Sequence, residues 1–371
     1  MDLTFLGQLR IVLWGSSVGL TIVLLLVGAH YYALAWGWCL QEAGANLGAM
    51  FRLFRIRPDL LRAEVWRKAG RFQWRWLSRG LWVSVGQTTN AMTSGMDLLI
   101  IARVLGPATV VIYSCTGKLV QVLQNQPQSL ASFALPGLSQ MKASESRERI
   151  RSVATSLTQA MILIGGAILC MVLPLNQQFV NHWTGAQYFG GILLTVLFLV
   201  NFIARLIDYT LALALFAFGY EKMYAIRSLL DSLVSVGLAC ALVRPFGIKG
   251  VLLGFASGAL LVAIPMDLYF FAREFHVTLI DAARPYFPYL WRAAAVGGAA
   301  YALLGRIEMP NLVVVAMAAA AVGLVYSLIA WPYVRRNELG GYINSVTTGL
   351  RTSLRSRIHN WRNKHLTSVV D

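Results

Sequence analysis

Charged residues are scarce in this chain. Only 13% of the 371 residues are Asp, Glu, Lys or Arg, and 16 acidic residues stand against 32 Lys and Arg. A soluble globular domain carries roughly 25% charged residues. Apolar residues take their place: 57% of the chain is hydrophobic and the mean hydropathy is +0.61. This composition excludes an ordinary soluble domain and indicates a membrane protein.

Motifs for catalysis and metal binding are also missing. The four cysteines (Cys39, Cys115, Cys170 and Cys240) are scattered, and no C-x-x-C pair occurs. Neither a disulfide framework nor a zinc site is therefore indicated. The sequence contains no H-E-x-x-H and no P-loop pattern, and its five histidines are isolated. We expect no catalytic residues, no metal, no cofactor and no enzymatic activity.

Long apolar runs recur along the whole chain. Lipid offers no water to backbone groups, so membrane spans must be helices or a closed barrel. The runs are too long and too uniformly apolar for barrel strands, which alternate over ~10 residues. The sequence therefore predicts an all-α polytopic membrane protein with about nine transmembrane helices. The expected spans are 11–39, 81–104, 107–136, 152–175, 190–217, 226–243, 248–271, 290–306 and 311–334.

The positive charges alternate between the two sides of these spans. Most of the 32 Lys and Arg lie in the segment 51–80, in alternate loops after it and in the tail 335–371. Arg227 is one of these expected loop charges. The opposite side carries only Arg10, Arg103, Arg244, Lys249 and Arg306. Basic loops stay cytoplasmic, so the C-terminal tail is predicted to be cytoplasmic. The net charge of +16 thus reports topology and attraction to anionic lipid, and we expect no nucleic acid partner.

Polar residues recur at helical spacing within four of the expected spans. They are Asn90, Thr93 and Asp97; then Lys118, Gln121, Asn125, Gln128 and Ser132; then Asn201, Arg205 and Asp208; and finally Ser228, Asp231, Ser232 and Ser235. Intramembrane charges cost ~2.5–3.5 kcal/mol each on insertion scales and usually face a bundle interior or a water path. Packed together, the four faces would line a hydrophilic cavity. Two structural alternatives stay open: an Arg205–Asp208 pair at i, i+3, and an Asp97–Lys118 pair between adjacent helices.

Several stretches carry a family resemblance. The segment "DLLIIARVLGPATVVIYSCTGKLV" at 97–120 is followed by "LPGLSQM" before a charged turn. The expected external loop contains "FVNHWTGAQYFGG", and a later turn reads "VRPFGIKGVLLG". Together these stretches, within residues 81–271, resemble Wzx-type polysaccharide flippases of the multidrug/oligosaccharidyl-lipid/polysaccharide exporter superfamily.

The resemblance implies a domain organisation. Residues 81–271 would form the second six-helix lobe of such a flippase, and 290–334 its two extra C-terminal helices. Residues 1–40 would be a single transmembrane helix left from the first lobe, 51–80 a basic cytoplasmic linker and 335–371 a basic cytoplasmic tail. About five N-terminal helices have no counterpart. We therefore expect an N-terminally truncated or degenerate form, or a half that finds its other lobe in a partner.

The resemblance also implies a function. Such a flippase translocates undecaprenyl-diphosphate-linked oligosaccharide across the bacterial inner membrane during O-antigen, capsule or exopolysaccharide biosynthesis. Lys118 and Arg205 would attract the diphosphate, and amide side chains would bond the sugar hydroxyls. The expected partners are this substrate, the bilayer, and the polysaccharide polymerase and glycosyltransferases of the pathway. The expected cavity residues are Asn90, Asp97, Lys118, Gln121, Asn125, Gln128, Asn201, Arg205 and Asp208.

Two other functions stay open. A cation-coupled small-molecule exporter on the same fold would use Asp97, Asp208 or Asp231 as a proton or sodium site, but two buried cations suit cationic drugs poorly. A membrane-embedded polysaccharide polymerase or ligase would need a large external loop for its chemistry. The longest expected external segment, 176–191, is short and contains no Lys, Arg, Asp or Glu.

Overall fold

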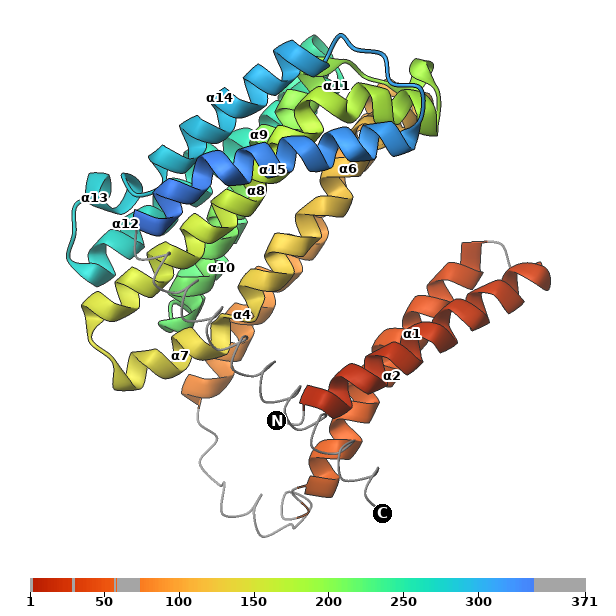
Figure 1. Ribbon diagram of the computed structural model, residues 1–371. Helices are drawn as coiled ribbons and strands as arrows, with labels where there is room; N and C mark the ends of the chain where they lie inside the picture. Colours follow the sequence, from red (N-terminus) through yellow and green to blue (C-terminus); the bar gives the residue numbers. More distant parts are fainter. Residues whose placement is uncertain (1–2, 29–30, 57, 59–73, 337–371) are drawn as a thin grey trace, which may run out of the picture. The chain divides into compact units, whose positions relative to one another are not determined.

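The described part of the protein consists of helices joined by short turns and loops. The computed structural model describes residues 3–28, 31–56, 58 and 74–336, and no strand occurs among them (Figure 1). The linker residues 59–73 and the tail residues 337–371 lie outside the described residues. The chain divides into two compact units, residues 1–77 and 78–371. The predicted all-α polytopic membrane protein is confirmed.

The first unit contains a helical hairpin where one span was expected. α1 (Leu3–Leu26) and α2 (Tyr31–Ile56) pack against each other, and the Ser17 hydroxyl donates to the carbonyl of Gly37 across the pair at 2.7 Å. Gly28 lies between them with φ +86°, a left-handed conformation that ends a helix and that glycine adopts without strain. The predicted continuous span 11–39 is therefore wrong, because the chain reverses direction near Gly28.

The second unit begins with a helix pair where the single span 81–104 was expected. α4 (Trp74–Thr93) and α5 (Met96–Leu105) divide the expected span 81–104, and Gly95, with φ +85°, lies between them. α6 (Pro107–Ser132), α7 (Leu135–Ser144) and α8 (Arg147–Trp183) come next. A short 3₁₀ turn, η2 (Ala186–Tyr188), leads into α9 (Ile192–Ala217). The expected external loop 176–191 is thus shorter than predicted, since α8 continues to Trp183.

The remaining helices complete the unit. They are α10 (Glu221–Phe246), α11 (Ile248–Gly258), the π-turn η3 (Ala259–Ala263), α12 (Ile264–Phe275), the short α13 (Leu279–Ala283), α14 (Phe287–Leu304) and α15 (Leu312–Arg336). α11, η3 and α12 form one continuous span, Ile248–Phe275.

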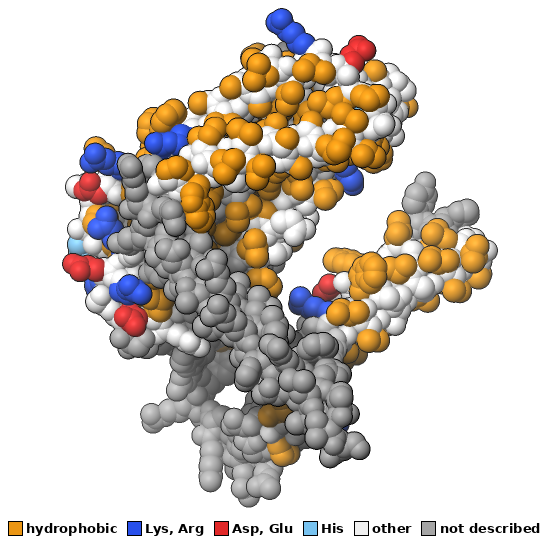
Figure 2. Space-filling model, viewed as in Figure 1, with side chains coloured by type: hydrophobic (Ala, Val, Ile, Leu, Met, Phe, Trp, Pro, Cys, Tyr) orange, Lys and Arg blue, Asp and Glu red, His pale blue; other side chains and the backbone are white. Residues whose placement is uncertain are grey.

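Six described helical segments are long and apolar enough to cross a membrane: Gly7–Leu26, Arg147–Trp183, Ile192–Ala217, Glu221–Phe246, Ile248–Phe275 and Leu312–Pro332. The expected spans 81–104, 107–136 and 290–306 do form helices, but they fall outside that set. The first two are the ones that carry many polar residues. Figure 2 shows apolar side chains covering the outer surface of α14 and α15. There Leu303, Val313 and Met317 are exposed, as expected of a lipid-facing surface.

α8 is the central helix of the second unit. It packs against α6, α9, α14 and α15. Its Gly165 and Gly166 permit this close packing: a Cβ on Gly165 would meet the Leu206 side chain of α9, and one on Gly166 would meet Tyr326 of α15. One side of α8 contributes Met161, Ile168 and Val172 to a core shared with α5, α6, α9, α10 and α11. The helices that carry polar residues are therefore held in place by an apolar core.

The length of α8 predicts the topology of its two ends. Its 37 residues extend about 55 Å at the α-helical rise, well beyond the roughly 30 Å hydrocarbon core. Reporter fusions after residues 145 and 345 should read cytoplasmic, and a fusion near residue 184 should read external, because the basic loops favour the cytoplasm. A phosphatase and fluorescent-protein reporter pair would check this. A cytoplasmic signal at 184 would contradict the orientation.

α10 and α11 form a hairpin with unusually close backbones. Gly250, Gly254 and Gly258 recur every four residues on one face of α11. A Cβ on Gly254 would lie 2.3 Å from the backbone nitrogen of Ala239, and one on Gly258 would lie 1.9 Å from the Ser235 hydroxyl. Small residues at such spacing let membrane helices approach closely. This contact fixes the position of the polar residues on α10.

The Gly254→Ala variant should therefore unfold more easily than the wild type, by about 1–3 kcal/mol, because the new methyl group collides with rigid backbone. The matched control is Gly237→Ala on α10, where nothing lies within 4 Å of the added Cβ. Alanine is the better helix former, so the control should be neutral or stabilising by up to about 1 kcal/mol. Denaturation in mixed micelles would measure both. Equal stability of the two variants would contradict the close contact.

Candidate functional site

A polar pocket opens among the helices of the second unit. Its volume is about 690 Å³, within the roughly 300–1,000 Å³ typical of ligand sites. α4, α5, α6, α9, α10 and α11 all contribute to its wall. The uncharged polar residues that line it are Gln87, Asn90, Thr93, Ser94, Tyr113, Gln124, Gln128, Ser132, Asn201, Tyr209, Tyr224 and Ser232. Amides and hydroxyls of this number can bond a ligand rich in hydroxyl groups.

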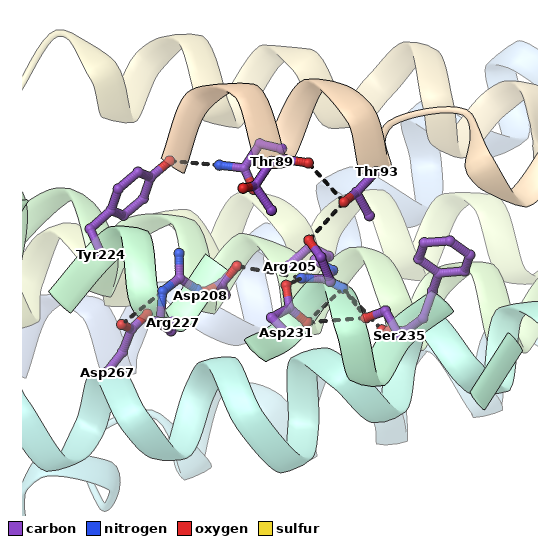
Figure 3. Close-up of polar contacts among 12 residues, drawn as sticks. Thr89, Thr93, Arg205, Asp208, Tyr224, Arg227, Asp231, Ser235 and Asp267 are labelled. Atoms are coloured by element: carbon purple, nitrogen blue, oxygen red, sulfur yellow. Dashed lines mark hydrogen bonds and ion pairs between the residues drawn. The ribbon is translucent and has the colours of Figure 1, made fainter. Parts of the chain in front are cut away.

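Arg205 is the centre of an ion-pair network on one wall of the pocket. Its guanidinium donates to both carboxylate oxygens of Asp231 on α10, at 2.5 and 3.2 Å, in the bidentate arrangement that favours arginine. It also donates to the Ser235 hydroxyl and to the carbonyl of Phe255, each at 3.1 Å. Asp208, one turn along α9, is more distant at 3.8 Å. The i, i+3 pair left open from sequence is thus the weaker contact (Figure 3).

Arg227 extends this network deeper into the unit. The residue is only 5% exposed, and it pairs with Asp208 of α9 and, at 3.4 Å, with Asp267 of α12. The ring of Tyr224 lies 5.3 Å from the guanidinium carbon. Together with the Arg205 contacts, two arginines and three aspartates join α9, α10 and α12 (Figure 3). Charges this deeply buried persist only when paired.

α4 is tied to α10 by neutral hydrogen bonds. The amide of Asn90 donates to the Tyr224 hydroxyl at 2.7 Å, and the hydroxyls of Thr93 and Ser232 lie 2.7 Å apart (Figure 3). These pairs cross the pocket wall between two helices distant in sequence. The wall is therefore a connected polar layer.

Six of the nine residues expected at a cavity line this pocket: Asn90, Asp97, Gln128, Asn201, Arg205 and Asp208. The other three, Lys118, Gln121 and Asn125, lie on α6 but are not among the lining residues. Lys118 is exposed, and no ion pair joins it to Asp97 among the described residues. Asp97 instead accepts a hydrogen bond from the Tyr113 hydroxyl at 2.8 Å.

Two members of the network were missed from the sequence. The prediction that Arg227 lies in a cytoplasmic loop is wrong, because α10 begins at Glu221 and Arg227 is buried on it. A signal was present: Arg227, Asp231 and Ser235 follow one another at i, i+4 on one helix face. Asp267 lies within an apolar run, and no polar residue stands three or four positions away from it to mark its helix face. Among the described residues, no group of acidic, histidine or cysteine side chains could hold a metal ion.

The first half of the chain identifies the family to which the protein belongs. The sequence pattern of the family described as "Polysaccharide biosynthesis protein" matches residues 1–192. This chain belongs to that family. Comparisons with curated proteins and with solved structures give no significant match. The polysaccharide part of the resemblance seen in the sequence is therefore confirmed.

The matched region covers one side of the pocket. It includes α4, α5 and α6, with Asn90, Asp97 and Gln128, and extends through α8 to η2. The arginine network on α9, α10 and α12 lies beyond it. As a family member with several membrane-crossing helices, the protein is a multi-pass membrane protein that acts in polysaccharide biosynthesis.

Proposed function

We propose that the protein is a flippase that moves undecaprenyl-diphosphate-linked oligosaccharide across the bacterial inner membrane. The observation that carries this proposal is the pocket of amides and hydroxyls among membrane-crossing helices of a polysaccharide biosynthesis protein. Sugar hydroxyls both donate and accept hydrogen bonds, and the amides of Gln124, Gln128 and Asn201 do the same. The lipid chain would remain in the bilayer while the sugars cross through the polar layer.

Binding of the substrate's diphosphate requires a positively charged side chain that is not already paired with a carboxylate. Arg205 and Arg227 are both engaged by aspartates. The pocket lining holds these two arginines and three aspartates, Asp97, Asp208 and Asp231, so its formal charge is not positive. Lys118 is exposed and makes no ion pair among the described residues. In this proposal Lys118, with Gln121 and Asn125 on the same helix, meets the diphosphate, and the pocket holds the sugars.

A transport assay with the full chain tests the function. Proteoliposomes would carry a fluorescent undecaprenyl-diphosphate oligosaccharide, and an external hydrolase would attack only headgroups on the outer leaflet. We expect the protein to expose the inner-leaflet pool within the assay, while a phosphatidylcholine with the same fluorophore stays protected. No acceleration over empty vesicles would overturn the proposal. Lengthening of the oligosaccharide would favour a polymerase instead, and uptake of small cationic dyes would favour a drug exporter.

The pocket itself can be tested with two glutamines on α6. Gln128 lines the pocket, whereas Gln126 is exposed and lies outside the lining. Gln128→Leu should slow flipping about tenfold, because the free energy of one or two hydrogen bonds to the sugar is lost. The matched Gln126→Leu variant should flip at the wild-type rate. Equal flipping rates for both variants would show that the sugars do not bind in this pocket.

A further inference from the structure

A second polar cavity lies apart from the pocket described above. Its volume is about 860 Å³, and it is formed by the start of α8 on one side and by the segment 277–288 on the other. The α8 wall carries Glu148, Arg151, Ser152, Thr155, Ser156 and Gln159. Their spacing of three, one, three, one and three places all six on one helix face. The opposite wall carries Asp281 and Arg284.

The two arginines of this cavity are available to a ligand. Among the described residues, neither Arg151 nor Arg284 makes an ion pair or a side-chain hydrogen bond. Arg151 is half-buried and Arg284 is exposed. Free guanidinium groups with five N–H donors each are the strongest protein partners for a phosphate group. The cavity therefore offers a phosphate site.

The two acidic residues make the cavity electrically balanced. Glu148 is exposed, and no partner is seen for it in the described part of the chain. Asp281 accepts one hydrogen bond, from the Thr278 hydroxyl at 2.8 Å, through Oδ2. A purely anionic ligand would leave both carboxylates facing a negative group. A ligand with one negative and one positive group could pair with the two arginines and with the two carboxylates at the same time.

Apolar residues beside the cavity place it at the edge of the hydrocarbon. Ile280 is 75% exposed and Phe287 66% exposed, and Trp291 is exposed one turn further along α14. Tryptophan is enriched where the membrane meets water. Figure 2 shows charged side chains of both signs gathered at the end of the unit where α12 and α13 lie. A ligand headgroup in this cavity would thus have its acyl chains beside Phe287 and Trp291.

From this geometry we propose that the cavity binds a zwitterionic phospholipid headgroup with a primary ammonium group, as in phosphatidylethanolamine. Arg151 and Arg284 hold its phosphate, and Glu148 and Asp281 hold its ammonium. A primary ammonium has three N–H donors, as the lysine side chain has, whereas the trimethylammonium of phosphatidylcholine has none. The site therefore discriminates between two lipids of equal charge. This site is separate from the proposed transport pocket and does not depend on it.

Native mass spectrometry of the full-length protein, extracted from bilayers of equal phosphatidylethanolamine and phosphatidylcholine content, tests the proposal. We expect the wild type to retain phosphatidylethanolamine preferentially. Arg284→Gln and Arg151→Gln should each reduce the total amount of phospholipid retained about tenfold, as expected for one lost charge-assisted contact to the phosphate that both lipids carry. Glu148→Gln should reduce the discrimination against phosphatidylcholine. The matched control is Arg273→Gln, an exposed arginine of α12 outside the cavity lining, which should retain the wild-type amount of lipid and the wild-type ratio.

Each remaining outcome overturns the proposal in a different way. Unchanged phospholipid retention in folded Arg151→Gln and Arg284→Gln variants would place the lipid elsewhere, and thermal unfolding in detergent would show that they are folded. When phosphatidylglycerol is added to the bilayer in equal amount, its preferential retention over phosphatidylethanolamine would mean that the carboxylates play no part. Displacement of the lipid by equimolar glycerophosphoethanolamine would identify a soluble phosphate ligand. Lipid retention is measured without transport, so failure here leaves the flippase proposal intact.

Discussion

Replacing Arg227 by leucine should lower the free energy of unfolding by about 3–5 kcal/mol, the cost of leaving buried partner charges unpaired. Asp267 is only 3% exposed and has no other cation within ion-pair distance among the described residues. Asp208 would keep only the 3.8 Å contact with Arg205. Denaturant titration in mixed micelles would measure the loss, and the variant should also accumulate poorly in membranes.

A matched control and a rescue make this prediction specific. Arg244→Leu removes an exposed arginine from the same helix, and it should change stability by less than about 0.5 kcal/mol. The double variant Arg227→Leu, Asp267→Leu removes one charge of each sign. It should be more stable than Arg227→Leu alone, since the orphaned carboxylate is gone. A double variant as unstable as the sum of the two single variants would show that the two residues are not coupled.

Replacing Lys118 by alanine should cut the flipping rate at least about tenfold, because the proposed diphosphate contact is charge-assisted. The side chain is exposed on α6, so the variant should fold and insert as the wild type does. Lys118→Arg keeps the charge and should retain most of the activity. The proteoliposome assay measures all three proteins.

The control for this experiment is Arg306→Ala, which removes another exposed cation just after α14. It should flip at the wild-type rate. If Lys118→Ala and Arg306→Ala behave alike, the diphosphate does not depend on Lys118. If Lys118→Ala fails to accumulate and a second change at Asp97 restores it, the two residues form a structural pair.

The apolar runs of the sequence were sufficient to predict the positions of most of the helices. The expected spans 152–175 and 226–243 lie within α8 and α10, and 190–217 differs from α9 only by two residues at its start, because an uninterrupted run of ~20 apolar residues satisfies its backbone groups in lipid by forming a helix. It failed at Gly28, where the predicted span 11–39 is divided into α1 and α2. The polar interruption after Gly28 is short, His30 with Tyr31 and Tyr32, so the prediction joined two helices across it.

The candidate site was predictable only in part. Helical spacing on single spans marked Asn90, Asn201 and Arg205, which the structure brings to one pocket. It could not tell that Lys118, on an equally polar face of α6, would lie outside the lining, since that depends on which neighbouring helix covers each turn.

The sequence by itself determined that this chain is helical and membrane-embedded, because backbone hydrogen bonding in lipid is a local requirement. Only the tertiary structure decided the partners of its buried charges. Arg227 is buried on α10 because Asp208 of α9 and Asp267 of α12 neutralise it. An arginine beside a loop and an arginine inside a bundle have the same hydropathy. The energy that separates them comes from carboxylates far along the chain, which only the packing of the helices brings within reach.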